Sequence, residues 1–390
     1  MSMEKGQLSI HTENFLPIIK KWLYSDRDIF IRELISNCCD AVAKRRMVGQ
    51  IPDDYQPRVT VRVDKEHRIL SFTDNGVGMT AEEVRKYINQ VAFSGANDFM
   101  EKYKDSGEQI IGHFGLGFYS AFMVADKVRI DTLSCLPDAK AVCWESDGSV
   151  EYTMEETERE EVGTTVTLYL NNESDEFLDG NTVKSTIRKY CSFMPTPIYC
   201  EVAEGEKKHE HDHEDGCECG HDHEHEENCE CGHDHEHEHE EEVPEMLNTP
   251  NPLYMRAPKD CTDEDYKKFY RDTFHEWDEP LFWIHLNADY PFNLHGILYF
   301  PRLKNEITNE GQVKLYSNQV FIADNIKEII PEFLLLLKGV VDFKAVFAEL
   351  DKIGYKGPFT VEMIPFCRLP DLVLPDQALA DKMAVQLATL

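Results

Sequence analysis

The pattern of apolar and polar positions predicts one amphipathic helix near the start of the chain, over residues 28–48. At 100° per residue, one arc of this helix is apolar and consists of Ile31, Leu34, Ile35, Cys38, Ala41 and Val42. Glu33, Asn37 and Asp40 fall together on the opposite arc. We therefore expect a helix with one apolar side and one side that carries two carboxylates and an amide.

Further apolar runs predict strands and helices in two blocks, residues 1–202 and 246–342. In the first block, the expected strands are residues 59–63, 69–73 and 164–170, and a glycine-rich stretch at 112–117 opens a helix that continues to about Val124. In the second block, the expected strands are residues 281–286, 297–300 and 313–321, and a helix covers residues 326–338. Strands interleaved with helices predict an α/β (α+β) fold class for both blocks.

The tract between these blocks, residues 203–245, has almost no apolar residue. Its residues 203–242 contain 18 acidic residues and two lysines, and nine residues from Cys217 to His225 recur from Cys229 to His237. Such a segment cannot bury a core, so we expect a disordered linker. Its thiols and imidazoles are ligand types that suit Zn²⁺ or Ni²⁺. The candidate ligands are Cys217, Cys219, His221, His223, Cys229, Cys231, His233 and His235. The alternative is an acidic spacer kept extended by its own charge.

Composition and charge exclude several classes of protein. The 390 residues are 42% hydrophobic and 29% charged, which is typical of a globular protein, and the net charge of −33 argues against a nucleic-acid binder. The most apolar run, residues 329–341, contains Glu332 and Lys338, so we expect no membrane span. The first residues lack the apolar segment of a signal peptide. With no export signal, the 12 cysteines indicate a cytoplasmic protein with reduced thiols.

Three short motifs are candidates for binding chemistry. Glu33 and Asn37 lie one turn apart on a helix, where a carboxylate could polarise water beside an amide that suits Mg²⁺; the alternative is a solvated polar face. The stretch from Asp74 to Met79 follows a strand, and its carboxylate could accept an adenine amino group; the alternative is an ordinary turn. The glycines at 112–117 could cradle phosphates at a helix start.

Taken in this order, these motifs closely resemble the split ATP site of the GHKL superfamily. The resembling segments are Arg32–Asn37, Asp74–Met79, Ile111–Phe122 and Gly163–Thr164. Within that superfamily they are similar to the heat shock protein 90 chaperones in their bacterial form. Segments of the second block are similar to the middle domain of the same family, namely Tyr266–Tyr270, Trp277–Leu281, Leu315–Asp324 and Lys338–Asp342.

The resemblance implies a Bergerat-type α/β sandwich that binds ATP with Mg²⁺, followed by part of an α/β middle domain. It implies Glu33 as the general base and Asn37 as the residue that holds Mg²⁺. It implies that Asp74 accepts the adenine amino group, assisted by Thr164 through water, and that residues 94–112 form a lid. The implied ATP-binding residues are Asn37, Asp40, Asp74, Asn75, Gly76, Gly78, Met79, Ser94, Gly95, Phe114, Gly115, Leu116, Gly117, Phe118 and Thr164.

The resemblance stops at Asp342. The arginine-bearing motif that meets the γ-phosphate in this family does not follow, and neither does a dimerisation domain, although the family is homodimeric. We therefore expect impaired turnover. Residues 343–390 begin with an expected helix and resemble the last βα unit of a xylose-isomerase-like TIM barrel; 48 residues cannot form such a barrel.

Two functions follow from these expectations. The first is an ATP-driven chaperone that binds ATP and ADP and closes on unfolded or client proteins. The second is a non-catalytic protein that binds ATP and metal. The domain organisation expected for either is residues 1–202, an acidic linker 203–245, a partial middle domain 246–342 and an unrelated tail 343–390.

Overall fold

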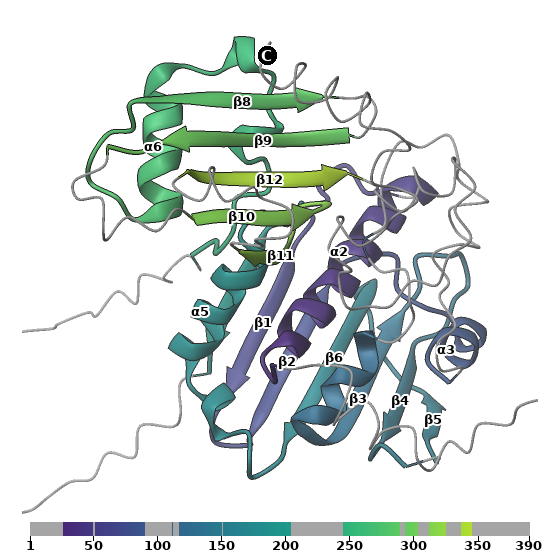
Figure 1. Ribbon diagram of the computed structural model, residues 1–390. Coiled ribbons are helices and arrows are strands. Elements are labelled where there is room, and N and C mark those ends of the chain that lie inside the picture. Colours follow the sequence, from purple (N-terminus) through teal and green to yellow (C-terminus); the bar gives the residue numbers. More distant parts are fainter. Residues whose placement is uncertain are drawn as a thin grey trace, which may run out of the picture.

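The computed structural model describes residues 26–49, 51–89, 111, 117–149, 151–203, 245–288, 293–302, 312–324 and 337–344. These residues form two β-sheets, each with helices against one face (Figure 1). In the part of the chain that the structure describes, no helix is long and apolar enough to cross a membrane.

The first sheet has seven strands in the order β5-β4-β3-β6-β2-β1-β7. Their bounds are β1 Val59–Asp64, β2 Ile69–Asp74, β3 Ala125–Leu133, β4 Val142–Ser146, β5 Thr153–Glu156, β6 Gly163–Leu170 and β7 Ile198–Val202. All neighbours pair antiparallel except β1 and β7, which pair parallel. A parallel pair of strands needs a long crossover connection. Between β1 and β7 this connection contains all the elements from β2 to α5.

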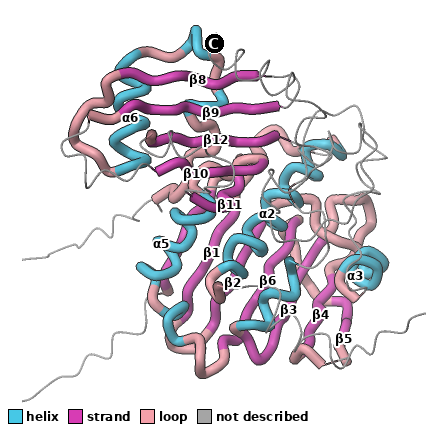
Figure 2. The backbone as a smooth tube through the Cα atoms, viewed as in Figure 1, coloured by secondary structure: helices cyan, strands magenta, loops and turns pink. Residues whose placement is uncertain are grey.

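Helices cover the inner face of this sheet, as Figure 2 shows. They are α2 Ile29–Val48, α3 Ala81–Tyr87, α5 Gly180–Cys191 and the 3₁₀ segments η3 Gly117–Met123 and η4 Asp175–Leu178. Alternate strand residues such as Val61, Phe72 and Ile130 are buried in one core with apolar residues of α2, α5 and η3. Helix α2 ends at Gly49, whose φ of +76° is the left-handed conformation that glycine adopts without strain.

The second sheet has five strands in the order β11-β10-β12-β9-β8. Their bounds are β8 Phe282–Ala288, β9 Asn293–Phe300, β10 Gln312–Ser317, β11 Val320–Asp324 and β12 Lys338–Lys344. Helix α6, Asp263–Phe274, begins at a capping box on Thr262 and packs its tyrosines on the sheet. The short 3₁₀ segments η5 Leu253–Met255 and η6 Pro258–Asp260 precede it.

The chain leaves and re-enters the first sheet at the same edge. The backbone N–H of Ala203 donates to Val63 O at 2.8 Å. After the linker, Met246 bridges Tyr199 on β7, and the N–H of Leu247 donates to Ile198 O at 2.9 Å. Because Leu247 is buried in the first core, the residues directly after the linker pack with the first sheet.

Some expectations about individual elements are confirmed and others are wrong. The helix at 28–48 and the strands at 59–63, 69–73, 164–170, 281–286 and 297–300 are present with small shifts at their ends. The strand expected at 313–321 is wrong, because Asn318 and Gln319 have φ of 50° and 66° and divide it into β10 and β11. The end of the helix expected at 326–338 is also wrong, since Lys338 opens β12; residues 325–336 lie outside the described part.

The helix expected to begin the tail at Phe343 is not formed there. Phe343 pairs with Leu294 and Lys344 pairs with Asn293, so β12 continues two residues past Asp342. The helix expected after the glycine-rich stretch is a 3₁₀ segment, η3, where the structure describes it. The expected linker, residues 204–244, and the rest of the tail, residues 345–390, lie outside the described residues.

Candidate functional site

A row of three polar side chains crosses the buried inner face of the first sheet. Asp74 ends β2 and pairs in register with Thr164 on β6, which pairs with Thr132 on β3. Their exposed fractions are 4%, 7% and 0%. Val59 and Val142 continue the row on either side. Three adjacent polar residues in an otherwise apolar layer are typical of a binding site, because buried polar groups need hydrogen-bond partners.

Asp74 is a buried carboxyl whose environment disfavours its charge. Burial raises its pKa to about 7, against opposing contributions from the backbone N–H groups of Gly76 and Thr164 and from Arg159. Asp74 Oδ1 accepts the Gly76 N–H at 2.8 Å. The Cys38 thiol on α2 lies beside this carboxyl, and burial together with Asp74 raises the pKa of the thiol. A buried carboxylate of this kind can accept a donor from a ligand.

The loop after Asp74 lies directly against α2 and β3. The N–H of Val77 donates to Ala41 O on α2 at 2.9 Å, and a Cβ added at Gly76 would lie 2.4 Å from the Ala41 carbonyl carbon. Gly78 has a φ of +64°, and a Cβ there would lie 1.9 Å from Leu133 O. Only glycine fits at these two positions, which agrees with the close backbone approach expected from the sequence.

Thr132 was not among the residues expected at the site. Its Oγ1 accepts the N–H of Met79 at 2.9 Å, lies 2.9 Å from Thr164 Oγ1 and donates to Gly163 O at 3.2 Å. The alternation of Val128, Ile130 and Thr132 along β3 places this hydroxyl on the inner face. That alternation is the sequence signal that could have identified it.

Glu33 lies on α2 near the first residue of η3. Its Oε1 accepts hydrogen bonds from Arg32 Nε at 3.2 Å and from Arg32 Nη2 at 2.6 Å. A Cβ added at Gly117 would lie 2.5 Å from Glu33 Oε2. The structure therefore brings Glu33 together with Gly117 from the glycine-rich stretch. The Glu33 side chain keeps 21% of its exposure, so water can reach it.

Asn37 and Asp40 occupy different environments, although the sequence placed them on one polar face. Asn37 is exposed, which suits an amide that holds a ligand-bound cation. Asp40 is 5% exposed, and its Oδ1 accepts the N–H of Ile111 at 2.6 Å. Asp40 therefore holds the segment next to the glycine-rich stretch on α2.

Asn75 binds a neighbouring loop with its side chain. Its Oδ1 accepts the N–H of Arg58 at 3.0 Å, and its Nδ2 donates to Gln56 O at 2.6 Å. Its carbonyl oxygen accepts a hydrogen bond from Arg45 Nη1 at 2.6 Å. These contacts support a structural role in fixing the loop that follows Asp74.

The apolar residues expected at the site adjoin the first core. Met79 is partly buried against it, and the ring of Phe118 packs edge-on with Phe122 and Trp144 at centroid distances of 6.2 and 5.8 Å. The remaining candidates lie outside the described residues: Ser94, Gly95, Phe114, Gly115, Leu116 and the linker residues Cys217, Cys219, His221, His223, Cys229, Cys231, His233 and His235. Among the described residues, no cluster of ligand side chains could hold a metal ion by itself.

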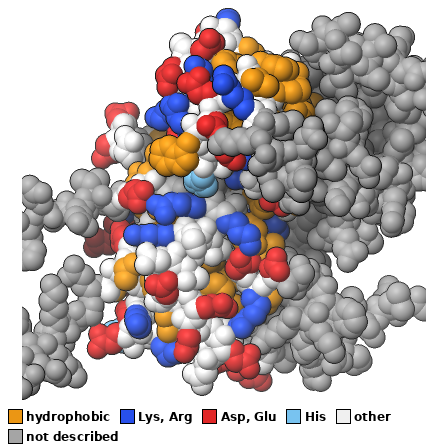
Figure 3. All heavy atoms as spheres, turned by 60° about the vertical axis from the view of Figure 1, so that its left-hand side comes forward, with side chains coloured by type: hydrophobic (Ala, Val, Ile, Leu, Met, Phe, Trp, Pro, Cys, Tyr) orange, Lys and Arg blue, Asp and Glu red, His pale blue; other side chains and the backbone are white. Residues whose placement is uncertain are grey.

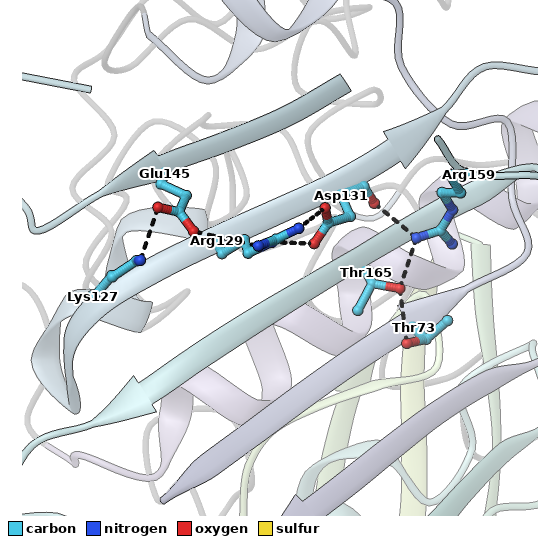
Figure 4. Close-up of polar contacts among 7 residues, drawn as sticks. All are labelled: Thr73, Lys127, Arg129, Asp131, Glu145, Arg159 and Thr165. Carbon is cyan, nitrogen blue, oxygen red and sulfur yellow. Dashed lines mark hydrogen bonds and ion pairs between the residues drawn. The ribbon is translucent and has the colours of Figure 1, made fainter. Parts of the chain in front are cut away.

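The outer face of the same sheet carries a different set of polar contacts (Figure 4). Arg129 pairs with Asp131 through two contacts of 2.7 Å, and Lys127 pairs with Glu145 at 2.8 Å. Thr73 and Thr165 share a hydrogen bond of 3.1 Å, so β2 and β6 carry a threonine contact on this face too. These side chains are satisfied by one another, which makes them useful controls for the inner row.

Two protein-family models match this chain. The model described as "Histidine kinase-, DNA gyrase B-, and HSP90-like ATPase" matches residues 26–167, which include α2, Asp74, Thr132 and Thr164. The model described as "Hsp90 protein" matches residues 176–346, which include all of the second sheet. The fold class expected from the sequence, a GHKL-type α/β sandwich, is confirmed by the first match together with the sheet and its helices.

Curated bacterial proteins are similar to most of the chain. A "Chaperone protein htpG" of Bacteroides fragilis (strain 638R) is 47% identical over 343 residues, which are 87% of this chain and 46% of that protein. A "Chaperone protein HtpG" of Porphyromonas gingivalis (strain W83) is 44% identical over 344 residues, with the same coverage. One from Desulfitobacterium hafniense is 33% identical over 353 residues. The chain spans about half the length of the curated relatives it matches.

Proposed function

The chain belongs to the Hsp90 family and is similar to its bacterial HtpG members, and from this premise we propose that it is an ATP-dependent molecular chaperone. The observation that carries the proposal is the buried row of Asp74, Thr164 and Thr132 under α2. An acceptor carboxyl fixed in an apolar layer suits the amino group of adenine, because an amino group supplies a hydrogen-bond donor to a buried acceptor.

The remaining site residues suit the phosphate end of the nucleotide. The exposed amide of Asn37 would hold Mg²⁺, which would neutralise phosphate charge. Glu33 would take a proton from the attacking water, since it lies close to η3 with a partly exposed carboxylate. The start of η3 at Gly117 and Phe118 would contribute backbone near the phosphates, together with Phe114, Gly115 and Leu116. Ser94 and Gly95 would belong to the lid.

An exposed apolar patch, made up of side chains from the loop before β8 and from the first residue of that strand, supports binding of unfolded or client proteins. Trp277, Leu281 and Phe282 keep 93%, 60% and 50% of their exposure, and Phe282 stacks on Phe300 at 4.0 Å between centroids. Figure 3 shows hydrophobic side chains gathered near the top of the molecule, where Figure 1 places β8. Large exposed aromatic groups in one patch are typical of protein-binding surfaces.

Turnover is the part of the chaperone cycle for which this chain offers the least support. The arginine-bearing motif expected after Asp342 is absent from the sequence. A missing arginine at the transition-state charge costs orders of magnitude in rate. The second candidate function, a non-catalytic protein that binds ATP and metal, is favoured by this observation and by the ten histidines in the linker.

Three further proposals concern a bound metal, the cellular location and the binding partners. We propose that the linker binds Zn²⁺ or Ni²⁺ through its repeated thiols and imidazoles. A cytoplasmic location is supported by the described cysteines, all of which are free thiols. The acidic charge supports a protein that binds neither nucleic acid nor anionic membrane.

Calorimetric titration of Mg-ADP into the whole chain and into Asp74→Asn tests the nucleotide site. We expect saturable one-site binding that is lost in Asp74→Asn. Asp131→Asn is the matched control, because Asp131 lies on the outer face of the same sheet and pairs with Arg129. Absence of binding by the unmodified chain, or equal loss in both variants, would contradict the proposed site. A hydrolysis assay of the unmodified chain then separates the chaperone cycle from the non-catalytic alternative.

A further inference from the structure

The loop before β6 places one arginine on the outer face of the first sheet. Arg159 Nη1 donates to Asp131 O on β3 and to Thr165 Oγ1 on β6, both at 3.0 Å. Its Nε donates to Glu161 O at 2.8 Å. Thr165 Oγ1 shares a further hydrogen bond of 3.1 Å with Thr73 Oγ1 on β2 (Figure 4). Arg159 therefore joins β3 to β6 directly, and reaches β2 through Thr165.

The outer-face residues that Arg159 connects are the chain neighbours of the inner row. They pair in register across β3, β6 and β2, and each stands one position from a member of that row: Asp131 beside Thr132, Thr165 beside Thr164 and Thr73 beside Asp74. Successive side chains of a strand point to opposite faces of the sheet. Arg159 therefore lies behind the inner row, on the other side of the same three strands.

The charge of Arg159 is not neutralised by a direct partner. Among the described residues its acceptors are two backbone carbonyls and one hydroxyl, none of which is charged. Arg129, on the same face, instead pairs with Asp131 through two contacts of 2.7 Å and lies 3.6 Å from Glu145. The field of a paired cation is largely cancelled by its partners, whereas that of an unpaired cation reaches more distant groups.

Asp74 is the buried carboxyl on which this charge acts. Burial raises its pKa to about 7, and the positive charge of Arg159 opposes that rise. The other ionisable groups near this carboxyl come from α2 and from the segment before β1: Cys38, Cys39, Asp40, Arg45 and Tyr55. The pKa values of both thiols and of the phenol are raised, so these three groups are neutral near pH 7.

We propose that Arg159 is a positioning residue of the nucleotide site, which holds the strands behind the base in register and keeps the Asp74 carboxylate ionised for a ligand donor. This inference rests on the proposed function and deepens it. An ionised carboxylate is the stronger acceptor, because protonation turns one of its oxygens into a donor. Arg159 acts through the strands and through its charge, from the face opposite to the site.

Carbon-13 NMR of the Asp74 carboxyl in the full chain tests the effect of this charge without any nucleotide. Aspartate labelled at the carboxyl carbon gives the signal, and Asp74→Asn identifies it by the loss of one resonance. In Arg159→Gln we expect the pKa of Asp74 to rise by about 0.5 or more, because a nearby opposite charge favours the ionised form. Arg159→Lys keeps the charge and should keep the pKa of the unmodified chain.

The affinity for Mg-ADP should follow the charge of Asp74. Arg159→Gln should bind Mg-ADP about twofold more weakly than the unmodified chain at pH 7 and equally well at pH 9, where Asp74 is ionised in both proteins. A purely structural role of Arg159 would instead weaken binding to the same extent at the two pH values. Thermal unfolding of each variant verifies that it is folded.

Lys127→Gln is the matched control. It removes one positive charge from the same face of β3, but Lys127 pairs with Glu145 at 2.8 Å (Figure 4). Lys127 also lies about 16 Å along the strand from Thr132, which exceeds the Debye length of about 8 Å at physiological ionic strength. We therefore expect the pKa of Asp74 to be unchanged in this variant.

The outcomes separate the two proposals. An unchanged pKa of Asp74 in Arg159→Gln would overturn the role of Arg159, whatever the affinity for nucleotide. An equal rise in Lys127→Gln, or no recovery in Arg159→Lys, would also overturn it. If the pKa rose as expected but the unmodified chain bound no Mg-ADP, the proposed function would fail, and with it the role of Arg159 in a nucleotide site.

Discussion

The backbone N–H of Gln319 donates a hydrogen bond to the carboxylate of Asp342 at 2.8 Å. Asp342 is 2% exposed and also accepts the hydroxyl of Tyr254 at 3.2 Å. The Gln319 side chain reaches the opposite way and donates to Phe193 O and Pro250 O at 2.8 and 3.1 Å. One residue of the β10–β11 turn thus connects strand β12 to the end of α5, and so connects the two sheets.

Gln319→Ala should lower the free energy of unfolding by about 1–3 kcal/mol, because two backbone carbonyls lose their donor. The measurement is urea unfolding followed by tryptophan fluorescence. Gln312→Ala is the control, since its side chain makes one exposed contact of 3.4 Å, with Asp324. Equal effects of the two substitutions would show that the contacts of Gln319 do not stabilise the junction.

The pKa of Asp74 gives the proposed nucleotide site a specific pH dependence. Burial raises this pKa to about 7, and the ionised carboxylate is the stronger acceptor for the amino group of adenine, because protonation turns one of its oxygens into a donor. Affinity for Mg-ADP should therefore fall about tenfold between pH 8 and pH 6. Mg-IDP carries the same phosphates without the amino group and supplies the baseline. A parallel decline of both nucleotides would place the titrating group elsewhere.

The same raised pKa has the opposite effect on stability. Between the ordinary pKa of 3.8 and about 7, the folded chain binds more protons at Asp74 than the unfolded chain does. The contribution of this group to the free energy of unfolding therefore decreases as pH rises through this window and is constant above it. Asp74→Asn should remove that slope, as chemical denaturation at several pH values can show.

Glu33→Gln should abolish any ATP hydrolysis while leaving Mg-ADP affinity within about twofold, since a general base contributes to rate and little to binding. Gly117→Ala should also slow hydrolysis, because the added Cβ would lie 2.5 Å from Glu33 Oε2. Gly180→Ala is its control, as the nearest atom there is a methyl group of Val202. Single-turnover hydrolysis is the measurement, and unchanged rates in Glu33→Gln would remove Glu33 from the mechanism.

Trp277→Ala should weaken suppression of aggregation of an unfolded protein without changing the unfolding midpoint of the chain. The reason is that Trp277 is 93% exposed and contributes surface and not core. Trp144→Ala, a buried tryptophan at 4% exposure, should instead lower the midpoint. A Trp277→Ala variant that protects the unfolded protein as well as the unmodified chain would exclude this patch as the client surface.

Replacement of residues 204–244 by a short glycine-serine turn should leave Mg-ADP affinity and the unfolding midpoint unchanged. The residues on both sides of this segment are held by the first sheet, because the Ala203 N–H donates to Val63 O on β1 at 2.8 Å and the Leu247 N–H donates to Ile198 O on β7 at 2.9 Å. Equilibrium dialysis should show that this variant loses any bound Zn²⁺ or Ni²⁺. Equal metal content in the two proteins would contradict the proposed metal linker.

The sequence predicted the elements whose pattern is local. The apolar arc of α2 and the alternation of β1, β2 and β6 depend on neighbouring residues only, and so do Asp74 and the glycines after it. The split at Asn318 and Gln319 was missed because an apolar run does not reveal left-handed backbone. Thr132 was missed because its importance arises from two pairings, with β6 and with the Met79 loop, that join distant parts of the chain.

The burial of Asp40 could not be predicted either. Helical periodicity placed it with Glu33 and Asn37 on a polar face, yet its carboxylate is covered and bonded to the N–H of Ile111. A carboxylate that binds a loop and a carboxylate that faces solvent occupy the same positions in the helical pattern of polar and apolar residues. Only the position of the loop separates the two roles.

The parallel pairing of β1 with β7 has a consequence for the order of synthesis on the ribosome. Residues 59–63 find their partners only at residues 198–202, and the other side of β7 is covered only when Met246 and Leu247 have been made. A nascent chain that has not reached residue 198 exposes the open edge of β1, and one that has not reached Met246 exposes the open edge of β7; either edge can pair with other chains. The acidic tract is translated after β7 and before Met246. Strand β7 can therefore pair with β1 while the negatively charged residues of the tract are still being added to the chain.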